Sequence, residues 1–273
     1  MSTHPYRGPV RAVIFDWAGT VVDFGSRAPA IAFQQVFAAE GVPITLDEAR
    51  VPMGMGKRDH IRAVSRLASV AERWRRARGA PCEELDVDRM YASFVPIQIA
   101  CLAAHADLVP GTLETVAALR ARGIRIGSTT GYSREMMDVL VPEASRRGFA
   151  PDAVACASDV VEARPSPLMC YRAALDLGVW PLAACIKVDD TLPGIDEGLN
   201  AGMWTVGVTL SGNELGLDAD EVSRLPASDL DVWRKRAERR MLDAGAHFVI
   251  DGVGDLVRCV DDVARRLAAG ERP

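Results

Sequence analysis

The chain has 273 residues, of which 49% are hydrophobic and 25% charged, a composition typical of a globular protein with one large core and a smaller second domain. Its net charge of -5 argues against nucleic acid as the main partner. Residues 94–104, the longest apolar-rich run, are too few to cross a bilayer, and residues 1–9 lack an apolar signal core. The six cysteines form no close pair, so we expect reduced thiols and a cytoplasmic protein without a membrane anchor.

Short β-rich runs alternate with helical patterns along most of the chain. We expect strands at residues 10–15, 124–129, 153–155, 185–188, 204–208 and 247–250. Helices are expected at residues 113–122, 134–147, 168–177, 195–201 and 230–244. This alternation predicts an α/β fold, a doubly wound parallel sheet with helices on both faces. In such sheets the functional site lies at the carboxyl ends of the strands.

The alternation breaks between residues 26 and 105, where the pattern is helical throughout. Five helices are expected there, at residues 28–40, 46–50, 58–67, 71–78 and 89–104. We therefore expect a helical cap domain of residues 26–105 inserted into a Rossmann-like catalytic core of residues 1–25 and 106–273. Residues 23–26 and 106–110 would be the two hinges. The arginines at positions 73, 75, 76 and 78 are expected on a solvated helix face.

Three carboxylates follow predicted strands. Asp16 comes directly after the first strand, where it could bind a metal, attack an electrophile or cap the following turn. Asp189 and Asp190 close the fourth strand, and two adjacent carboxylates among apolar residues are costly unless a cation compensates them. Mg²⁺ held by one or two carboxylates and a phosphate is a natural solution, although the pair could also start a helix.

Other polar residues lie at neighbouring positions of the predicted sheet. Thr130 and the backbone around Gly131 could hold phosphate oxygens, since successive N–H groups at a helix start bind anions. Alternatively, Thr130 or Ser133 caps the next helix. Arg164, just before another helix, could balance the charge of a phosphoryl group, or it could be an ordinary surface arginine.

Lysine is scarce: of the 32 basic residues only three are lysines, namely Lys57, Lys187 and Lys235. Only lysine offers an amine that can lose its proton and attack a carbonyl. Lys187 lies inside a predicted strand and Lys235 on a polar helix, so structural and solvated positions are expected for these two. Lys57 follows a glycine-rich stretch of the predicted cap, which suits close approach to a ligand.

The order Asp16, Thr130, Arg164 and Asp190 resembles the motif series of the haloacid dehalogenase superfamily. Most phosphatases of that superfamily carry a second Asp, a general acid, two residues after the nucleophile, whereas this chain has Ala18. Cleaving a phosphate ester by this route normally needs that proton donor. A carbon leaving group instead needs an electron sink, which a lysine condensed with a neighbouring aldehyde provides.

Longer strings make the resemblance more specific. Residues 14–20, 52–54, 127–132 and 200–207, with Lys57, resemble the phosphonoacetaldehyde hydrolase (phosphonatase) family. This resemblance implies hydrolysis of the C–P bond of phosphonoacetaldehyde. It implies that Asp16 attacks phosphorus to form an aspartyl-phosphate and that Lys57 forms the Schiff base.

The resemblance also implies further roles. Mg²⁺ would be held by the Asp16 carboxylate, the Ala18 carbonyl and Asp190, and the chain would form a homodimer through the cap. Asp190 is preferred to Asp189 because Gly194 stands where a second metal-site acid often falls. The remaining residues implied to hold the phosphoryl group or lie near the substrate are Thr130, Gly131, Arg164, Met53 and Tyr132.

Two residues near Lys57 could assist it. His60, about one helical turn on, could bind substrate and shuttle protons, although a packing role is about as plausible. Arg58 could lower the pKa of the Lys57 amine. The rival functions are a phosphomonoesterase or phosphomutase, which Ala18 disfavours, a metal-free haloacid dehalogenase, and a binding module without activity.

Overall fold

The computed structural model describes residues 5–273, so the first four residues of the predicted core segment 1–25 lie outside it. Six strands form one sheet in the order β3-β2-β1-β4-β5-β6, and all five pairs are parallel. The strands are β1 Ala12–Phe15, β2 Arg125–Thr130, β3 Ala153–Cys156, β4 Cys185–Asp189, β5 Trp204–Val208 and β6 Phe248–Ile250. The predicted doubly wound parallel sheet is confirmed.

The central strands are buried on both faces. All four residues of β1 are buried, and Val13 and Phe15 contact one apolar cluster while Ala12 and Ile14 contact another. A parallel strand covered by helices on both sides needs apolar residues at successive positions, which explains the continuous hydrophobic run. Each strand therefore ends with its last side chains at one edge of a rigid layer.

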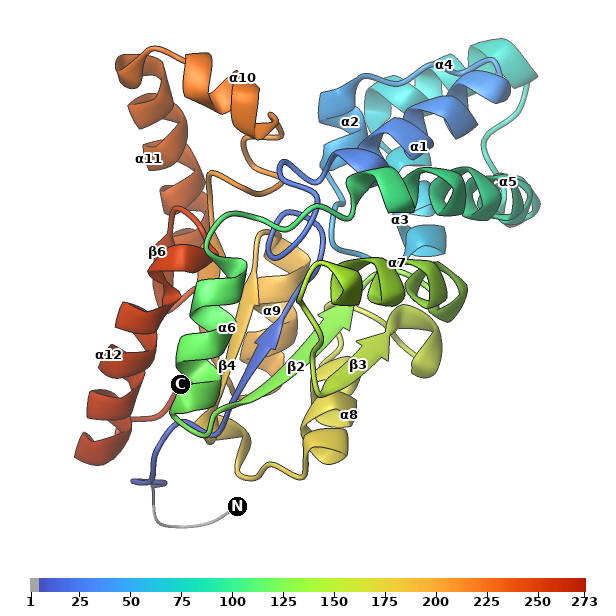
Figure 1. Ribbon diagram of the computed structural model, residues 1–273. Coiled ribbons are helices and arrows are strands. Elements are labelled where there is room, and N and C mark those ends of the chain that lie inside the picture. The colour runs from blue at the N-terminus through green and yellow to red at the C-terminus, as the bar shows by residue number, and fades with distance from the viewer. Residues whose placement is uncertain (1–4) are drawn as a thin grey trace.

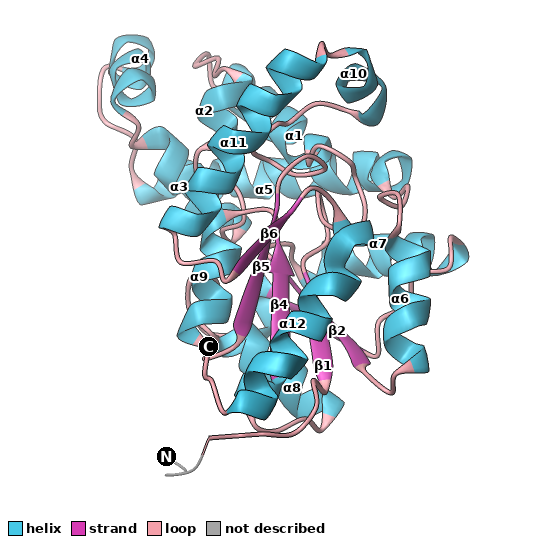
Figure 2. Cartoon of the chain, turned by 90° about the vertical axis from the view of Figure 1, so that its left-hand side faces the viewer, coloured by secondary structure: helices cyan, strands magenta, loops and turns pink. Residues whose placement is uncertain are grey.

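Helices cover both faces of the sheet (Figure 2). One face carries α6 Thr112–Ala121, α7 Arg134–Arg146 and α12 Leu256–Ala269. The other carries α8 Leu168–Leu177, α9 Leu192–Asn200 and α11 Ala227–Asp243, with the short α10 Ala219–Arg224 before α11. Two of these, α10 and α12, fall outside the predicted elements. Every helix of residues 5–273 is too short or too polar to cross a membrane.

Five helices lie together beyond the carboxyl ends of the strands (Figure 1). They are α1 Arg27–Ala39, α2 Leu46–Arg50, α3 Lys57–Ser65, α4 Ala68–Arg78 and α5 Glu84–Leu102, each close to a predicted helix. The two linkers lie side by side, since the Asp23 amide donates to the Asp107 carbonyl at 3.1 Å. This arrangement fits the predicted cap of residues 26–105, whose independence as a domain stays a prediction.

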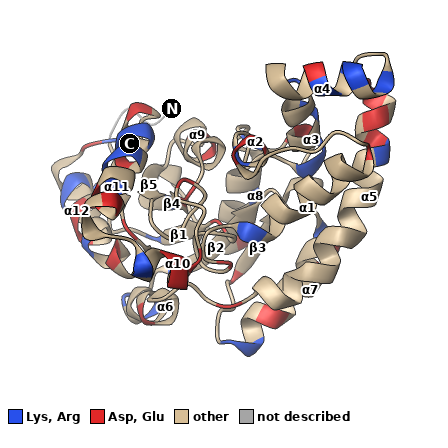
Figure 3. Cartoon of the chain, turned by 90° about the horizontal axis from the view of Figure 1, so that it is seen from above, with Lys and Arg blue, Asp and Glu red and all other residues tan. Residues whose placement is uncertain are grey.

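Lys, Arg, Asp and Glu are spread along the helices of the insertion and of the core (Figure 3). Of the four arginines predicted on a solvated face of α4, Arg75, Arg76 and Arg78 are exposed. Arg73 is only partly exposed and pairs with Glu48. Lys235 is also solvated, with 72% of its side chain exposed beside Asp231 on α11. The charged groups that require an explanation are therefore the buried ones.

Candidate active site

The predicted site residues of the core lie at the carboxyl ends of three adjacent strands. Asp16 follows β1, Thr130 ends β2, and Asp189 ends β4 with Asp190 after it. Because β2, β1 and β4 are neighbours in the sheet, these ends share one edge. The chain order reverses around β1, which is the kind of switch point where ligands bind in open parallel sheets.

The loop after β1 holds Asp16 in place. Its amide donates to the Val188 carbonyl at 2.9 Å, and the Trp17 carbonyl accepts from the amides of Val21 and Val22 at 2.9 and 3.0 Å. Gly19 has φ +86°, and a Cβ atom there would lie 2.2 Å from the Asp190 carboxylate. Only glycine allows this tight turn beside a second carboxylate.

Arg164 joins the acidic groups and is 3% exposed. Its Nη2 lies 2.8 Å from Asp16 Oδ1 and 3.1 Å from Asp189 Oδ2, while Nε lies 2.8 Å from Glu197 Oε2. These carboxylates hold the pKa of the guanidinium well above its usual value although burial opposes them. The surface alternative for Arg164 is wrong, because the side chain is a fixed cation in the site.

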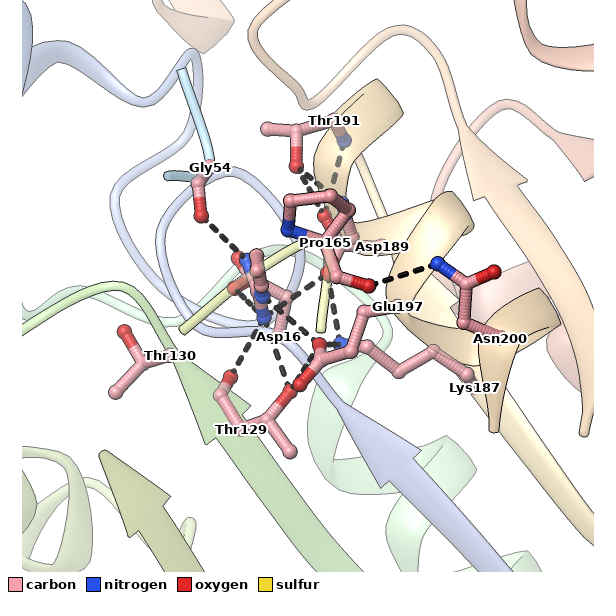
Figure 4. A network of polar contacts seen from close by, with 12 residues as sticks. Asp16, Gly54, Thr129, Thr130, Pro165, Lys187, Asp189, Thr191, Glu197 and Asn200 are labelled. Atoms are coloured by element: carbon pink, nitrogen blue, oxygen red, sulfur yellow. Dashed lines mark hydrogen bonds and ion pairs between the residues drawn. The ribbon is translucent and has the colours of Figure 1, made fainter. Parts of the chain in front are cut away.

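Arg164 belongs to a buried polar network, of which Lys187, Asp189 and Glu197 are labelled in Figure 4. Lys187 Nζ lies 2.7 Å from Asp189 Oδ2 and 3.6 Å from Glu197 Oε2, and the Thr129 hydroxyl donates to Glu197 Oε2 at 2.9 Å. Lys187 is fully buried, which fits the structural role expected for it. Paired charges of this kind are tolerated in a core because each is hydrogen-bonded.

The three aspartates differ in their surroundings. Burial, together with the charge of Asp189, raises the pKa of the Asp16 carboxyl to about 6 against the opposing charge of Arg164. Burial and the neighbouring Asp16 raise the pKa of Asp190 well above its usual value. For Asp189 burial acts in the same direction, but Arg164 and Lys187 outweigh it and lower the pKa.

This arrangement suits a divalent cation. Single oxygens of Asp16, Asp189 and Asp190 lie within 4.8 Å of one another. With Glu197, these carboxylates carry more negative charge than the two buried cations of the network offset. A hard cation with carboxylate ligands would compensate the excess.

Asp189 and Asp190 are held by different partners. Asp189 Oδ1 accepts from the Thr191 hydroxyl at 2.6 Å and from its amide at 3.0 Å. Asp190 accepts from the Thr20 hydroxyl at 3.2 Å and from the Asn213 amide at 2.7 Å. Lysine, arginine and threonine side chains already engage Asp189, whereas no basic side chain pairs with Asp190 among the described residues. The choice of Asp190 as the metal ligand stays a prediction.

The glycine at position 194 has a physical reason. A Cβ atom there would lie 2.0 Å from the Asp189 carboxylate, so no side chain fits. Asp189 occupies the space that a second acid at position 194 would need. Asp189 and Gly194, which both depart from the superfamily pattern, therefore depend on each other: the aspartate fits only because position 194 has no side chain.

Lys57 is the first residue of α3 and is 6% exposed. Its Nζ lies 4.8 Å from the centre of the Tyr132 ring and 5.7 Å from that of Phe33. Burial lowers the pKa of the amine to about 8, with Asp16 opposing and Arg164 adding to the fall. Arg58, which was expected to lower this pKa, is not among its main causes and pairs at the surface with Glu84 and Asp88.

His60 lies in the packing of the insertion. His60 is fully buried, and its ring stacks on that of Phe33 with 3.7 Å between the ring centres. Its Nε2 atom lies 2.8 Å from the Ala49 carbonyl oxygen. Burial and the charge of Lys57 lower its pKa well below the usual value. It is absent from the residues that line the site cavity, so the packing alternative fits it better.

Most of the other predicted residues meet around one small cavity of about 20 Å³, room for roughly one water molecule. Insertion and core are in close contact there, since a Cβ atom at Gly131 would lie 2.5 Å from the Met55 carbonyl. A groove of about 280 Å³ adjoins the cavity and shares Lys57 and Gly131 with it. The predicted residues that line the cavity are Asp16, Ala18, Met53, Lys57, Thr130, Gly131, Tyr132 and Arg164.

Neither Thr130 nor Ser133 caps the following helix, which was the alternative role considered for them. Ser133 precedes α7, but its side chain makes no capping hydrogen bond. The Thr130 hydroxyl instead accepts from the Tyr132 amide at 3.1 Å. Thr130 therefore faces the site, 3% exposed.

Three residues of the site had no functional interpretation from the sequence. Glu197 comes from α9, one helix away from the strand ends, and Thr191 caps that helix. Asn213 lies in a segment for which the sequence suggested no role. The capping role of Thr191 could have been predicted from the sequence, because threonine before an apolar helical pattern is typical of a helix start.

Comparisons with known proteins place the chain in a family. Residues 10–202 match haloacid dehalogenase-like hydrolases. Proteins from Hahella chejuensis and Paraburkholderia xenovorans, both named phosphonoacetaldehyde hydrolase, are each 52% identical; the matches cover 98% and 97% of this chain and 91% and 99% of theirs.

Solved structures agree with this. The crystal structure of a phosphonoacetaldehyde hydrolase-like protein from Oleispira antarctica is 46% identical and superposes with a TM-score of 0.98 over 100% of this chain and 99% of its own. A β-phosphoglucomutase from Clostridium difficile, 18% identical with a TM-score of 0.68 over 95% and 99%, shares the fold alone. The chain therefore belongs to the phosphonoacetaldehyde hydrolase family of haloacid dehalogenase-like hydrolases.

Proposed function

We propose that this chain hydrolyses the carbon–phosphorus bond of phosphonoacetaldehyde to acetaldehyde and phosphate. Relatives about half identical over nearly their whole length carry that activity in their names. The observation that carries the proposal is the buried amine of Lys57, which lines the same cavity as Asp16. Ala18 supports it, because a phosphatase would need a general acid at this position.

Lys57 would allow the carbon bonded to phosphorus to leave with the electron pair of the C–P bond. Its pKa of about 8 leaves a useful fraction of neutral amine near neutral pH. That amine condenses with the aldehyde, taking up a proton and losing water, to give an iminium ion. When the C–P bond breaks, its electron pair moves into the adjacent C–C bond and neutralises the nitrogen, forming an enamine.

Asp16 would receive the phosphoryl group. Its carboxylate oxygen attacks phosphorus opposite the leaving carbon, and an aspartyl-phosphate forms. Arg164, fixed 2.8 Å from Asp16, offsets the charge on the phosphoryl oxygens, with Thr130 and Gly131 as further donors. Protonation at carbon and hydrolysis of the iminium release acetaldehyde from Lys57, and water then releases phosphate from Asp16.

Asp16, Asp190 and the Ala18 carbonyl would hold Mg²⁺, which when bound supplies positive charge beside the phosphoryl oxygens. Met53 and Tyr132, which line the cavity, would lie against the substrate. A cytoplasmic location and a homodimer through the helical insertion are also part of the proposal.

Acetaldehyde and phosphate release from phosphonoacetaldehyde with Mg²⁺ tests the proposal. We expect both products from the wild type and neither from Lys57→Arg, because arginine keeps the charge but cannot form the imine. Lys235→Arg, at the exposed lysine of α11, is the matched control and should retain activity. Equal activity in Lys57→Arg would overturn the imine, and turnover of sugar phosphates alone would favour a phosphatase or phosphomutase.

A further inference from the structure

An arginine of the helical insertion contacts the core loop of residues 211–216, beside the proposed metal site. Arg50 is the last residue of α2 and is half-buried. Its Nη1 donates to the Asn213 side-chain oxygen at 3.2 Å, and its Nη2 donates to the Gly216 carbonyl at 3.0 Å. Asn213 donates back from Nδ2 to the Arg50 carbonyl at 3.4 Å. The two residues therefore hold each other from opposite sides of the junction.

The same arginine holds the first linker. Its Nη1 also donates to the Gly25 carbonyl at 2.9 Å and to the Ser26 carbonyl at 3.4 Å. The Gly25 amide donates in turn to the Ser211 carbonyl at 2.7 Å. The linker and the loop of residues 211–216 are thus fastened to one another, with the guanidinium between them.

Two glycines allow the linker, the loop and the guanidinium to pack this closely. Gly216 has φ +69°, and a Cβ atom there would lie 2.6 Å from the Arg50 Cζ. At Gly25, with φ +86°, a Cβ atom would lie 2.3 Å from the Leu217 carbonyl oxygen. Both positions have a left-handed backbone, which favours glycine. The contact at Gly25 is with backbone and excludes a side chain, whereas a side chain at position 216 would displace the Arg50 guanidinium.

The loop reaches the proposed metal ligand directly. The Asn213 amide donates to Asp190 Oδ2 at 2.7 Å. A Cβ atom on the preceding Gly212 would lie 2.4 Å from the Asp190 Cβ. Any movement of this loop must therefore shift a hydrogen bond that orients the Asp190 carboxylate.

We propose that Arg50 is a positioning residue that couples the seating of the helical insertion on the core to the orientation of Asp190, and so to metal affinity. The inference rests on the proposed role of Asp190 as a metal ligand. Loss of an outer-shell partner of a ligand commonly weakens metal binding by roughly 10–100-fold. The four oxygens that accept hydrogen bonds from the guanidinium are uncharged, while its charge also acts on Asp190 without a hydrogen bond. A lysine at position 50 keeps that charge, so it tests the hydrogen bonds separately.

Binding of Mn²⁺ alone, followed by electron paramagnetic resonance of the free ion, tests the coupling without relying on turnover. Mn²⁺ is a suitable probe since it shares the oxygen ligands of Mg²⁺. Arg50→Lys keeps the charge but cannot reach four acceptors, and we expect about tenfold weaker Mn²⁺ binding. Asn213→Ala should cause a similar loss, and the double variant little more, because both act through one contact.

Arg27→Lys is the matched control. Arg27, the first residue of α1, also joins the insertion to the core, at 2.8 Å from Asp218 and 2.5 Å from Glu221. Its partners make no hydrogen bond to Asp190, so Mn²⁺ affinity should stay within about twofold of the wild type. An equal loss in Arg27→Lys, or a lower melting temperature of Arg50→Lys with wild-type affinity, overturns the coupling.

Asp190→Asn separates this inference from the proposed function. Loss of Mn²⁺ binding in Asp190→Asn with none in Arg50→Lys overturns the coupling and leaves the metal site intact. Unchanged binding in Asp190→Asn overturns the metal site itself, and the coupling falls with it.

Discussion

At the scale of single residues, the chemistry depends on a lysine amine that burial makes less basic. The pKa of Lys57 is lowered to about 8, and only the neutral amine attacks an aldehyde. The neutral fraction therefore grows as the pH rises through 8. We predict that kcat/KM for phosphonoacetaldehyde increases up to about pH 8 and then levels off. A rise centred near the ordinary lysine pKa of about 10.4 would show that the amine is not desolvated.

Glu197 is a residue whose importance only the fold reveals. It is fully buried, and its Oε2 lies 2.8 Å from Arg164 Nε. Glu197→Gln keeps the shape but removes a charge from the network, and we predict a fall of about 2 kcal/mol in the free energy of unfolding, measured in urea. Glu72→Gln, in an exposed pair with Arg76, should change it little. Equal effects would contradict the network.

Three of the residues that the sequence identified share one property. Asp16, Thr130 and Asp190 follow predicted strands, so the rule for parallel sheets places them at one edge without any knowledge of packing. Glu197 and Asn213 follow no such rule. Glu197 reaches the site from the side of a helix, and Asn213 reaches it through a backbone amide, which carries no signal in the residue type.

At the scale of elements, the turn between β4 and α9 assigns different tasks to its two aspartates. Asp189→Asn would weaken the bonds to Lys187 and Arg164, and we predict a loss of about 3 kcal/mol in stability with Mn²⁺ binding largely kept. Asp190→Asn should have the opposite effects on stability and on Mn²⁺ binding. It should keep stability and weaken Mn²⁺ binding by more than the roughly 10–100-fold typical of outer-shell changes. The reverse pattern would make Asp189 the ligand.

The elements themselves were largely predictable. All six predicted strands are present, with ends within two residues of the observed ones, because buried parallel strands are short apolar runs between turn residues. Helix α12 was missed although its buried residues 256, 260, 263 and 267 follow the helical period. Helix α10 has no buried residue, so its main signal was the capping box of Asp218 and Glu221.

At the scale of the whole molecule, the cavity of about 20 Å³ is too small for a phosphonoaldehyde. The adjoining groove reaches Lys57 and Gly131 but not Asp16, so we expect the insertion to move away from the core for substrate to reach both groups. Gly56 lies before α3, and a Cβ atom there would be 3.4 Å from the Ala163 Cβ of the core, close to disulfide geometry of about 3.5–4.5 Å. We predict that Gly56→Cys with Ala163→Cys is inactive when oxidised and recovers with dithiothreitol.

The two single cysteine variants are the controls for this closure. Each should be insensitive to oxidant and reductant, since neither can form the bridge. Full activity of the oxidised double variant, with the disulfide verified by mass spectrometry, would show that catalysis needs no opening. The size of the movement could not be predicted from sequence, because it depends on how tightly Gly54 and Gly131 allow the two parts to approach.

The central claim is that Lys57 forms an imine with the substrate, and borohydride trapping measures this most directly. Reduction during turnover of phosphonoacetaldehyde, followed by peptide mass spectrometry, should find the substrate-derived group on Lys57. The adduct should be absent from Lys187 and Lys235, and absent altogether from Lys57→Arg. Release of acetaldehyde with no adduct on Lys57, or an adduct on another lysine, would contradict the account.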